Sequence, residues 1–438
     1  MSTPPENVYC FISGKNWKLS LSELTSYFDA RSCSFEVSEF SRSFFTIKTQ
    51  TPLDWSIIDE LGGTLKIVEV AAFVPTEHIA AAFIKEDKAA KRQLKFDFPL
   101  DVVADGMPRA DSGKSVFGVS VYWADPDFRH AARLAQRYVG SAMKDELKEQ
   151  DKKARFMGFP QGRDNPQLTA VEVIKQNLIE NRAEVVVCFG KTQTALGVTA
   201  AVHNPFEFQK RDVEKPVQRK MFAIPPRLSK ILINLTHCTP GRTFLDPFCG
   251  VGTILQEALL SRAKVVGLDI NRWCVDAAKR NLDWIAREYE IPDAAFTVVQ
   301  GDVREMVPKI HGGIDCIATE PDLGPALREL PTAEYAQEII SHLNPLFEDF
   351  LSEAHQVLRE GGRLAVVTPY IKVRVGKPVR MEIQRMAENV GFTTVKPFSA
   401  TAFVESAADF PLRDMMAFIE VDERHMVGRE ITVFQKPA

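Results

Sequence analysis

Stretches typical of strands alternate with stretches typical of helices over residues 8–75. The predicted strands are residues 9–14, 34–40, 44–49 and 64–74, and helices are predicted between them from Ser20 onward and over 52–63. The first helix is expected to begin at the capping box Ser20-Leu21-Ser22-Glu23. The resulting order, strand, helix, strand, strand, helix, strand, fits a ferredoxin-like fold.

The pattern breaks over residues 86–115, where a charged stretch is followed by turn residues. A second α/β unit follows, with predicted strands at residues 116–123, 154–159, 183–190 and 194–205 and predicted helices from Pro126 and from Leu168. The sequence therefore predicts a domain at 1–85, a linker at 86–115, a second domain at 116–205 and a further linker at 206–220.

Residues 221–438 show short apolar strands that alternate with helices. The predicted strands are 243–246, 265–270, 296–302, 314–321, 363–370, 393–398 and 429–436, and the predicted helices are 225–237, 254–263, 271–289, a long helical stretch that ends before Gly361, and 380–391. This alternation predicts a Rossmann-like, doubly wound and mostly parallel sheet. Ligands of such a sheet bind beyond the carboxyl ends of its strands.

The composition is that of an ordinary soluble protein, because 45% of the 438 residues are apolar and 26% are charged. No run of about 18 apolar residues predicts a membrane span, and the N-terminus does not resemble a secretory signal. The seven cysteines are scattered and form no C-x-x-C pair, which argues against a zinc site or a disulfide framework and predicts no bound metal. We therefore expect a cytoplasmic protein with no membrane partner.

The segment "LDPFCGVGT", 245–253, is expected to end a strand and to open a helix through a glycine-rich turn. Asp269 ends the next predicted strand and Asp302 the one after it, where such folds hold ribose hydroxyls. The glycines read G-x-G, and Leu255 takes the place of a third glycine, which weakens a dinucleotide interpretation. Asp246 would repel a phosphate but would suit an ammonium group. A cofactor with an amino-acid end, a ribose and an adenine therefore fits better than NAD.

These motifs, "DPFCGVGT", "GLDI", "GD" and "TEPD" in that order, resemble those of class I S-adenosylmethionine-dependent methyltransferases. The resemblance implies that Asp246 and the turn at Gly250 and Gly252 face the methionine part of the cofactor. It also implies that Asp269 holds the ribose. The remaining implied contacts are Ile270 against the adenine, Asp302 and Val303 at the adenine edge, and Phe248 and Thr253 within the turn.

The chain resembles more specifically the THUMP-containing tRNA guanine-N2-methyltransferases that act on the guanosine at tRNA position ten. The similarity lies in "DPFCG-G", in the segment 201–236 and in the closing "RHMVGREITVFQK". It implies that residues 116–205 form a THUMP-like domain that docks on tRNA, and that the enzyme (EC 2.1.1 class) methylates the exocyclic N2 amine of a guanosine. A small activating subunit, which some relatives need, is a further implied partner.

The predicted acceptor loop departs from that family. The family pattern is Asp/Asn-Pro-Pro-aromatic, whereas this chain has Thr319-Glu320-Pro321-Asp322. The Thr319 hydroxyl can accept one hydrogen bond, the Glu320 carboxylate is a substitute for the missing acid, and Asp322 cannot stack on a base. Tyr370 and Tyr335 are the rings considered as replacements. We predict an altered amine methyltransferase in preference to an inactive one.

Two basic clusters are predicted to contact RNA phosphates, although the formal net charge is −4. The residues are Lys210, Arg211, Lys215, Arg219 and Lys220 in the first cluster and Lys372, Arg374, Lys377 and Arg380 in the second. A guanosine within a tRNA helix would have to be flipped out to reach the methyl donor. The alternatives left open are a DNA amine methyltransferase, a non-catalytic RNA-binding homologue, and a protein that uses S-adenosylmethionine only for stability.

Overall fold

The computed structural model describes residues 6–109, 113–158, 165–219, 224–310, 312–398, 402–403 and 411–438. The chain forms two compact units. The first contains residues up to Leu21, Cys33–Pro205 and Thr401–Asp409, and the second contains Ser22–Ser32, Phe206–Ala400 and Phe410–Ala438.

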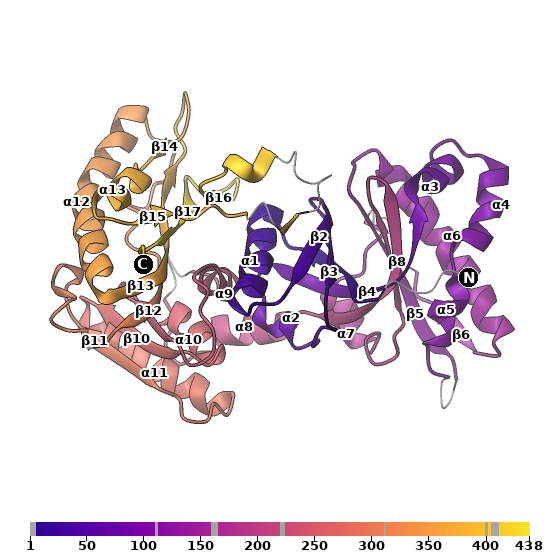
Figure 1. The fold of residues 1–438 in the computed structure, drawn as a ribbon, viewed down its shortest axis with the longest axis horizontal. Coiled ribbons are helices and arrows are strands. Elements are labelled where there is room, and N and C mark those ends of the chain that lie inside the picture. The colour runs from indigo at the N-terminus through magenta and orange to yellow at the C-terminus, as the bar shows by residue number, and fades with distance from the viewer. Residues whose placement is uncertain are drawn as a thin grey trace. The chain divides into compact units, whose positions relative to one another are not determined.

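The first unit is built on one eight-stranded sheet with the order β2-β3-β1-β4-β8-β7-β5-β6 (Figure 1). Its elements are β1 (Val8–Ser13), the start of α1 (Trp17–Ala30), β2 (Phe35–Phe40), β3 (Phe44–Thr49), α2 (Ile57–Glu60), β4 (Thr64–Pro75), α3 (Thr76–Phe83), α4 (Lys88–Asp97), α5 (Leu100–Asp105), β5 (Ser115–Trp123), α6 (Phe128–Glu149), β6 (Ala154–Phe156), α7 (Ala170–Lys175), β7 (Glu184–Phe189) and β8 (Gln193–Val202). From Ser22 onward, α1 belongs to the second unit. The predicted βαββαβ order is confirmed, and β1 lies antiparallel between β3 and β4, as in a ferredoxin-like fold. Antiparallel pairing of β4 with β8 joins this motif to the following α/β elements in a single sheet.

Two local predictions in this unit need correction. Helix α1 begins at Trp17 and not at Ser20, because the Asn16 side chain accepts a hydrogen bond from the Leu19 amide and so caps the helix earlier. Residues 86–115 are not an open linker, since they contain α4 and α5. Asp87 caps α4 by accepting a 2.7 Å hydrogen bond from the Ala89 amide, and Leu94 is buried in the core of the unit.

A buried charged network ties the sheet of the first unit together. The Lys66 ammonium forms an ion pair with Glu184 and donates a 2.9 Å hydrogen bond to the Leu168 carbonyl. The Ser120 and Thr199 hydroxyls each donate a 2.6 Å hydrogen bond to the Glu184 carboxylate. Because β4, β5, β7 and β8 each contribute a side chain, the charges are compensated inside the sheet, as buried charges must be.

The second unit has a sheet with the order β11-β10-β9-β12-β13-β17-β15, to which β14 and β16 are added at β13 and β17. Its elements are α8 (Pro205–Val213), α9 (Pro226–Leu235), β9 (Thr243–Asp246), α10 (Thr253–Leu260), β10 (Lys264–Asp269), α11 (Arg272–Glu288), β11 (Phe296–Gln300), η1 (Val303–Glu305), β12 (Ile314–Thr319), α12 (Ala333–Val357), β13 (Leu358–Ile371), β14 (Val379–Arg380), α13 (Ile383–Asn389), β15 (Thr393–Thr394), η4 (Pro411–Asp414), β16 (Phe418–Glu420) and β17 (Val427–Gln435).

The sheet of the second unit is the predicted Rossmann-like, mostly parallel one. Strands β9 to β13 pair in parallel, and only the last strands are antiparallel, with β17 pairing along β13 from Arg363 to Ile371. The predicted strand at 393–398 is reduced to two residues, β15. The carboxyl ends of β9, β10, β11 and β12 therefore share one edge, and the loops that leave this edge carry the predicted site.

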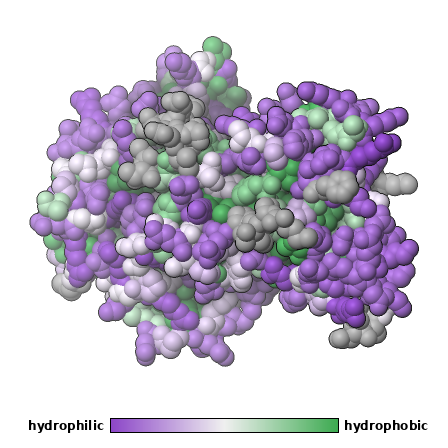
Figure 2. Space-filling model, turned by 45° about the vertical axis from the view of Figure 1, so that its right-hand side comes forward, coloured by the Kyte–Doolittle hydropathy of each residue, from purple (hydrophilic) through white to green (hydrophobic). Residues whose placement is uncertain are grey.

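The face of the molecule drawn in Figure 2 is covered mostly by hydrophilic residues. None of the helices within the described ranges is both long enough and apolar enough to cross a membrane.

Candidate functional site

The glycine-rich turn after β9 is held by two carboxylates. Asp246 accepts a 3.1 Å hydrogen bond from the Phe248 amide, and Asp269, at the end of β10, accepts a 2.9 Å hydrogen bond from the Gly250 amide. Gly252 has a φ of +87°, and a Cβ there would lie 3.2 Å from the Ala278 side chain. A larger residue would thus be strained and crowded, whereas Gly250 faces open space.

Asp269 sits between the turn and an exposed apolar surface. Its second oxygen accepts a 2.8 Å hydrogen bond from the Asn271 amide. Ile270 is 65% exposed, and Trp273 on the first turn of α11 is 53% exposed. A carboxylate beside exposed apolar side chains at a strand end suits a nucleoside, because the acid can accept from ribose hydroxyls while the apolar groups cover a flat base.

Asp302 follows β11, as predicted, but its carboxylate already has a partner. It accepts 3.0 Å hydrogen bonds from the Arg304 amide and from the Arg304 guanidinium. These contacts with Arg304 lower the pKa of Asp302 to about 2. Val303, which begins the short η1 helix, is buried.

Asp246 and Thr319 form a buried pair between neighbouring strand ends. The Thr319 hydroxyl donates a 2.6 Å hydrogen bond to the Asp246 carboxylate. Asp246 is 1% exposed and Thr319 is 0% exposed. Burial raises the pKa of Asp246 to about 7, against the lowering effect of the Thr319 hydrogen bond. The Thr319 hydroxyl therefore faces Asp246, and its predicted role as an acceptor for a substrate amine stays a prediction.

The Glu320 carboxylate is bound by the guanidinium of Arg429 on β17. The Arg429 Nη2 atom donates a 3.1 Å hydrogen bond to Glu320 Oε1, and its Nε atom donates to Glu320 Oε2. The Glu320 side chain is 10% exposed and that of Arg429 is 22% exposed. The Glu320 carboxylate is thus engaged in a bidentate ion pair, and its predicted role in place of the family's missing acid stays a prediction.

The rest of the acceptor loop is fixed by contacts of its own. Asp322 is exposed and accepts a 2.9 Å hydrogen bond from the Gly324 amide, so it closes a turn. Farther along, Arg374 pairs with Glu329 at 2.7 Å and donates a 2.7 Å hydrogen bond to the Leu330 carbonyl. Of the two rings considered, Tyr370 is half-buried on β13 and Tyr335 is 47% exposed at the start of α12.

The first basic cluster is largely structural. Arg211 is 6% exposed and forms a 2.6 Å ion pair with Glu257 of α10, and Lys215 is 3% exposed and donates a 3.0 Å hydrogen bond to the Thr253 hydroxyl. The assignment of these two residues to RNA phosphates is therefore corrected: both side chains point into the unit.

Three residues of that cluster remain. Lys210 pairs with Glu288 of α11, and Arg219 is exposed. Lys220 lies outside the described residues.

The second basic cluster surrounds the hairpin between β13 and β14. Lys372 donates hydrogen bonds to the Asp422 and Glu423 carbonyls, and Arg380 forms a 3.0 Å ion pair with Glu430. Arg374 and Lys377 are exposed beside Val375, which is 86% exposed at the tip of the hairpin. Because Arg374 already pairs with Glu329, Lys377 is the exposed side chain of this cluster that no described residue engages.

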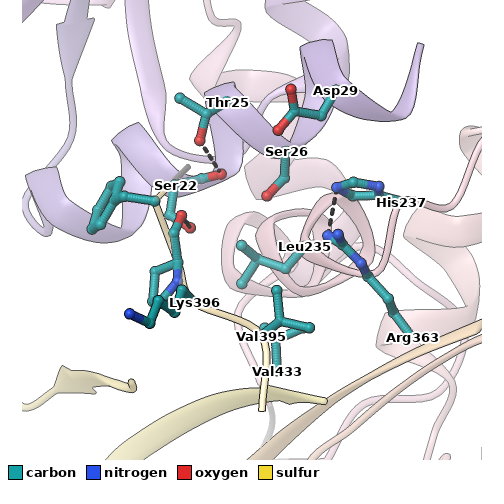
Figure 3. Close-up of a pocket in the computed structure, with 12 residues that line it drawn as sticks. Ser22, Thr25, Ser26, Asp29, Leu235, His237, Arg363, Val395, Lys396 and Val433 are labelled. Atoms are coloured by element: carbon teal, nitrogen blue, oxygen red, sulfur yellow. Dashed lines mark hydrogen bonds between the residues drawn. The ribbon is translucent and has the colours of Figure 1, made fainter. Parts of the chain in front are cut away.

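A separate pocket of about 270 Å³ lies at the opposite end of β13 (Figure 3). Arg363 contacts the His237 ring there, and burial together with Arg363 lowers the pKa of His237 to about 3. The pocket contains none of the predicted site residues. Its lining residues are Ser22, Thr25, Ser26, Asp29, Leu235, His237, Arg363, Val395, Lys396, Pro397, Phe398 and Val433.

The contacts that the sequence did not predict join residues far apart in the chain. Arg429 stands 109 positions after Glu320, and no spacing rule connects an arginine on a C-terminal strand with a loop acid. The contact of Lys215 with Thr253 was not predicted either, because the sequence pattern assigns Lys215 to a basic cluster and Thr253 to the glycine-rich turn. The Asp302–Arg304 pair differs in having a local signal, since it lies within the segment "GDVRE".

The arrangement fits a cofactor with an amino-acid end and a nucleoside. Four features follow one another along the carboxyl edge of β9 and β10: Asp246, the open space above Gly250, Asp269 and Ile270. Asp246 repels a phosphate when it is charged, which disfavours a dinucleotide at the turn.

Comparison with known proteins agrees with this geometry. Residues 217–391 match the UPF0020 family, described as an RMKL-like methyltransferase domain. A tRNA (guanine(10)-N2)-dimethyltransferase of Methanothermobacter thermautotrophicus is 32% identical over 159 residues, which cover 36% of this chain and 42% of the relative. An enzyme of the same name from Pyrococcus abyssi is 31% identical over 193 residues, which cover 44% of this chain and 50% of the relative. The matched region thus spans half or less of the length of each relative.

The fold of the whole chain is similar to a solved structure, TrmN from Thermus thermophilus. The TM-score is 0.53 at 16% sequence identity, and the similarity covers 98% of this chain and 99% of that chain. Residues 217–391 therefore resemble a methyltransferase domain, and the fold of the chain is similar to that of TrmN.

Proposed function

We propose that the chain transfers a methyl group from S-adenosylmethionine to the exocyclic N2 amine of a guanosine in tRNA. The observation that carries this proposal is the cofactor edge, where Asp246, the Gly250 turn and Asp269 lie together within a domain that matches the UPF0020 methyltransferases. The guanosine and the tRNA are inferred from the names of the relatives from Methanothermobacter and Pyrococcus. The proposed compartment is the cytoplasm.

The residues of this chain would divide the work as follows. Asp269 would hold the ribose hydroxyls, Ile270 would cover the adenine, and Asp246 would face the amino-acid end through the turn. S-adenosylmethionine, when bound, supplies an electrophilic methyl group. The chain has to place the amine nitrogen in line with that methyl, and positioning of this kind accounts for much of the rate of such reactions.

The acceptor loop would hold the amine mainly through its backbone. The Thr319 hydroxyl is turned to Asp246 and the Glu320 carboxylate to Arg429. The Glu320 backbone carbonyl is the group that corresponds to the amine acceptor in the family pattern. In this proposal, Arg429 is a positioning residue that fixes the loop, and Thr319 sets the charge of Asp246.

A second candidate function, a non-catalytic RNA-binding homologue, is favoured by one observation. Each polar side chain of Thr319-Glu320-Pro321-Asp322 is engaged inside the protein or its own loop, and the loop has no aromatic ring. Such a protein would bind the cofactor and tRNA without transferring a methyl group.

The deciding experiment is incubation of the protein with labelled S-adenosylmethionine and total tRNA, followed by nucleoside mass spectrometry. N2-methylguanosine or N2,N2-dimethylguanosine is expected, and a different methylated nucleoside would contradict the proposed substrate. Cofactor binding without any methylated product would support the non-catalytic candidate.

A further inference from the structure

A second cavity lies beside β14 and β17, away from the cofactor turn. Its volume is about 660 Å³. Arg380, Met381, Arg385, Met416, Ile419 and Glu430 are among the residues that line it, and they come from β14, the start of α13, the segment before β16, β16 itself and β17. Two arginines, several acids and apolar side chains therefore surround one space.

Glu430 is the unusual residue of this cavity. It is 5% exposed, and its Oε1 atom accepts a 3.0 Å hydrogen bond from the Arg380 guanidinium. Its Oε2 atom is also buried and has no hydrogen-bond partner within the part of the chain that the structure describes. Burial raises the pKa of Glu430, and the contact with Arg380 lowers it. A buried carboxylate oxygen without a donor is costly, and it calls for a ligand that donates hydrogen bonds.

The strand that carries Glu430 also links the cavity to the acceptor loop. Arg429, the preceding residue on β17, pairs with Glu320. Successive side chains of a strand point to opposite faces of the sheet, so Glu430 points away from Glu320. The cavity is therefore a space of its own, one residue along β17 from the acceptor loop.

The lining selects a chemical class of ligand. A carboxylate with two oxygens matches the edge of guanine, where the N1–H and N2–H groups donate side by side. Met381, Met416 and Ile419 offer apolar contact to a flat base. Arg380 pairs with Glu430 and Arg385 pairs with Glu382, but their side chains are 55% and 78% exposed, so both can also donate to a nucleotide phosphate at the mouth of the cavity.

We propose that this cavity is a second nucleobase site, which binds a guanine of the RNA substrate other than the methylated one through the Glu430 carboxylate. The identification of the ligand as RNA rests on the proposed function, whereas the preference for a guanine edge follows from the cavity. Such a site would hold the RNA next to the acceptor loop and would contribute to the choice of substrate.

The test is a titration of the full chain with guanosine, inosine and adenosine 5′-monophosphates, in which calorimetry or NMR measures the binding. We expect saturable binding of the guanosine nucleotide, at least tenfold tighter than that of the adenosine nucleotide. Inosine, which lacks the N2 amine, should be intermediate. Equal binding of the three nucleotides, or no binding at millimolar concentration, would overturn the proposal.

Two variants and a control locate the binding. Glu430→Gln should weaken binding of the guanosine nucleotide at least tenfold. Ala417→Phe, which fills the cavity while Glu430 stays in place, should weaken it to a similar extent, and it replaces the first variant if Glu430→Gln is unstable. Glu388→Gln, an exposed change on α13 outside the cavity lining, should leave binding unchanged. Retained selectivity in both cavity variants would place the nucleotide elsewhere.

The proposed site and the proposed function fail separately. Guanosine nucleotide binding that depends on Glu430 in a protein that methylates no tRNA would count against the function alone. An active methyltransferase whose RNA affinity and nucleotide binding do not respond to either cavity variant would count against the site alone.

Discussion

The hydroxyl of Thr319 donates a 2.6 Å hydrogen bond to the carboxylate of Asp246, and both side chains are buried. This contact joins the end of β12, from which the acceptor loop leaves, to the end of β9, from which the cofactor turn leaves. Because the donor faces a carboxylate, it favours the charged form of Asp246.

Replacement of Thr319 by Val should therefore shift the pH dependence of cofactor binding. Loss of the hydroxyl raises the pKa of Asp246 further above its value of about 7, so less of the carboxylate is charged at neutral pH. We expect S-adenosylmethionine affinity at pH 7 to fall about tenfold and to recover at higher pH. Calorimetry between pH 6 and pH 9 measures this, with Thr319→Ser as the control. An unshifted profile would mean that Asp246 does not govern binding.

Asp246 should also destabilise the unliganded protein at alkaline pH. Its folded pKa of about 7 lies above the ordinary value of 3.8, so the folded state binds this proton more tightly than the unfolded state does. The free energy of unfolding then falls as the pH rises from about 4 to about 7.

The variant Asp246→Asn should remove this pH dependence. Its melting temperature should exceed that of the unchanged protein by about 5 °C at pH 8 and by much less at pH 5. Differential scanning fluorimetry without cofactor provides the comparison. Equal differences at both pH values would contradict the raised pKa.

Asp269 should be essential for cofactor binding, because in the proposed function it holds the ribose and because it also fixes the turn. It accepts hydrogen bonds from the Gly250 and Asn271 amides. Asp269→Ala should weaken S-adenosylmethionine binding by about 100-fold or more, since both the ribose contact and the turn geometry are lost. Asp269→Asn, which keeps one acceptor, should be intermediate, and the circular dichroism spectrum should be unchanged in both. Undiminished binding by the alanine variant would refute the cofactor site.

The periodicity of the sequence predicts that Asp246 and Asp269 lie at one edge, because neighbouring parallel strands end at the same edge of a sheet. That rule places Asp246 and Asp269 close together without knowledge of any contact, and the structure brings both to the Gly250 turn. The same rule places Asp302 at this edge, but the Arg304 guanidinium binds its carboxylate. Strand order alone does not predict this contact, because it depends on the side-chain conformation of Arg304.

The acceptor loop and the basic clusters were harder to predict for a different reason. A charged residue reads as exposed in a sequence, yet Arg211 and Lys215 are buried because Glu257 and Thr253 on α10 provide partners for them. Arg429 reaches Glu320 because β17 pairs antiparallel with β13. Partners of this kind lie far away in the sequence, so no local sequence pattern reveals them.

The ion pair between Arg211 and Glu257 should be required for stability and not for RNA binding. The two side chains are 7% and 1% exposed, and Lys230 also approaches Glu257 at 3.5 Å. Glu257→Gln leaves two buried cations with reduced compensation, which should cost about 3–5 kcal/mol. Thermal unfolding measures the loss.

The control for this prediction is Asp276→Asn. Asp276 pairs with Arg272 on the surface of α11, where the two side chains are 52% and 66% exposed, and the change should cost less than about 0.5 kcal/mol. A similar, small loss in both variants would show that Arg211 is not held by Glu257 and would restore it as a candidate for RNA contacts.

The ion pair of Glu320 and Arg429 should determine turnover without affecting the cofactor. Arg429→Met leaves a mostly buried carboxylate without its bidentate partner, so the acceptor loop should lose its fixed position. We expect kcat with tRNA to fall about 10- to 100-fold, because a small misplacement of the amine is enough for such a loss. The affinity for S-adenosylmethionine should stay within about twofold, since Asp246 and Asp269 hold the turn and both remain in place.

A double variant separates charge from position. Glu320→Met together with Arg429→Met removes both buried charges, so it should be more stable than Arg429→Met alone while remaining poorly active. Arg424→Met is the matched control, because Arg424 also pairs with an acid, Asp422, but its side chain is 84% exposed. If the double variant were as active as the unchanged protein, the ion pair would only stabilise the fold, and the backbone of the loop would hold the amine without its help.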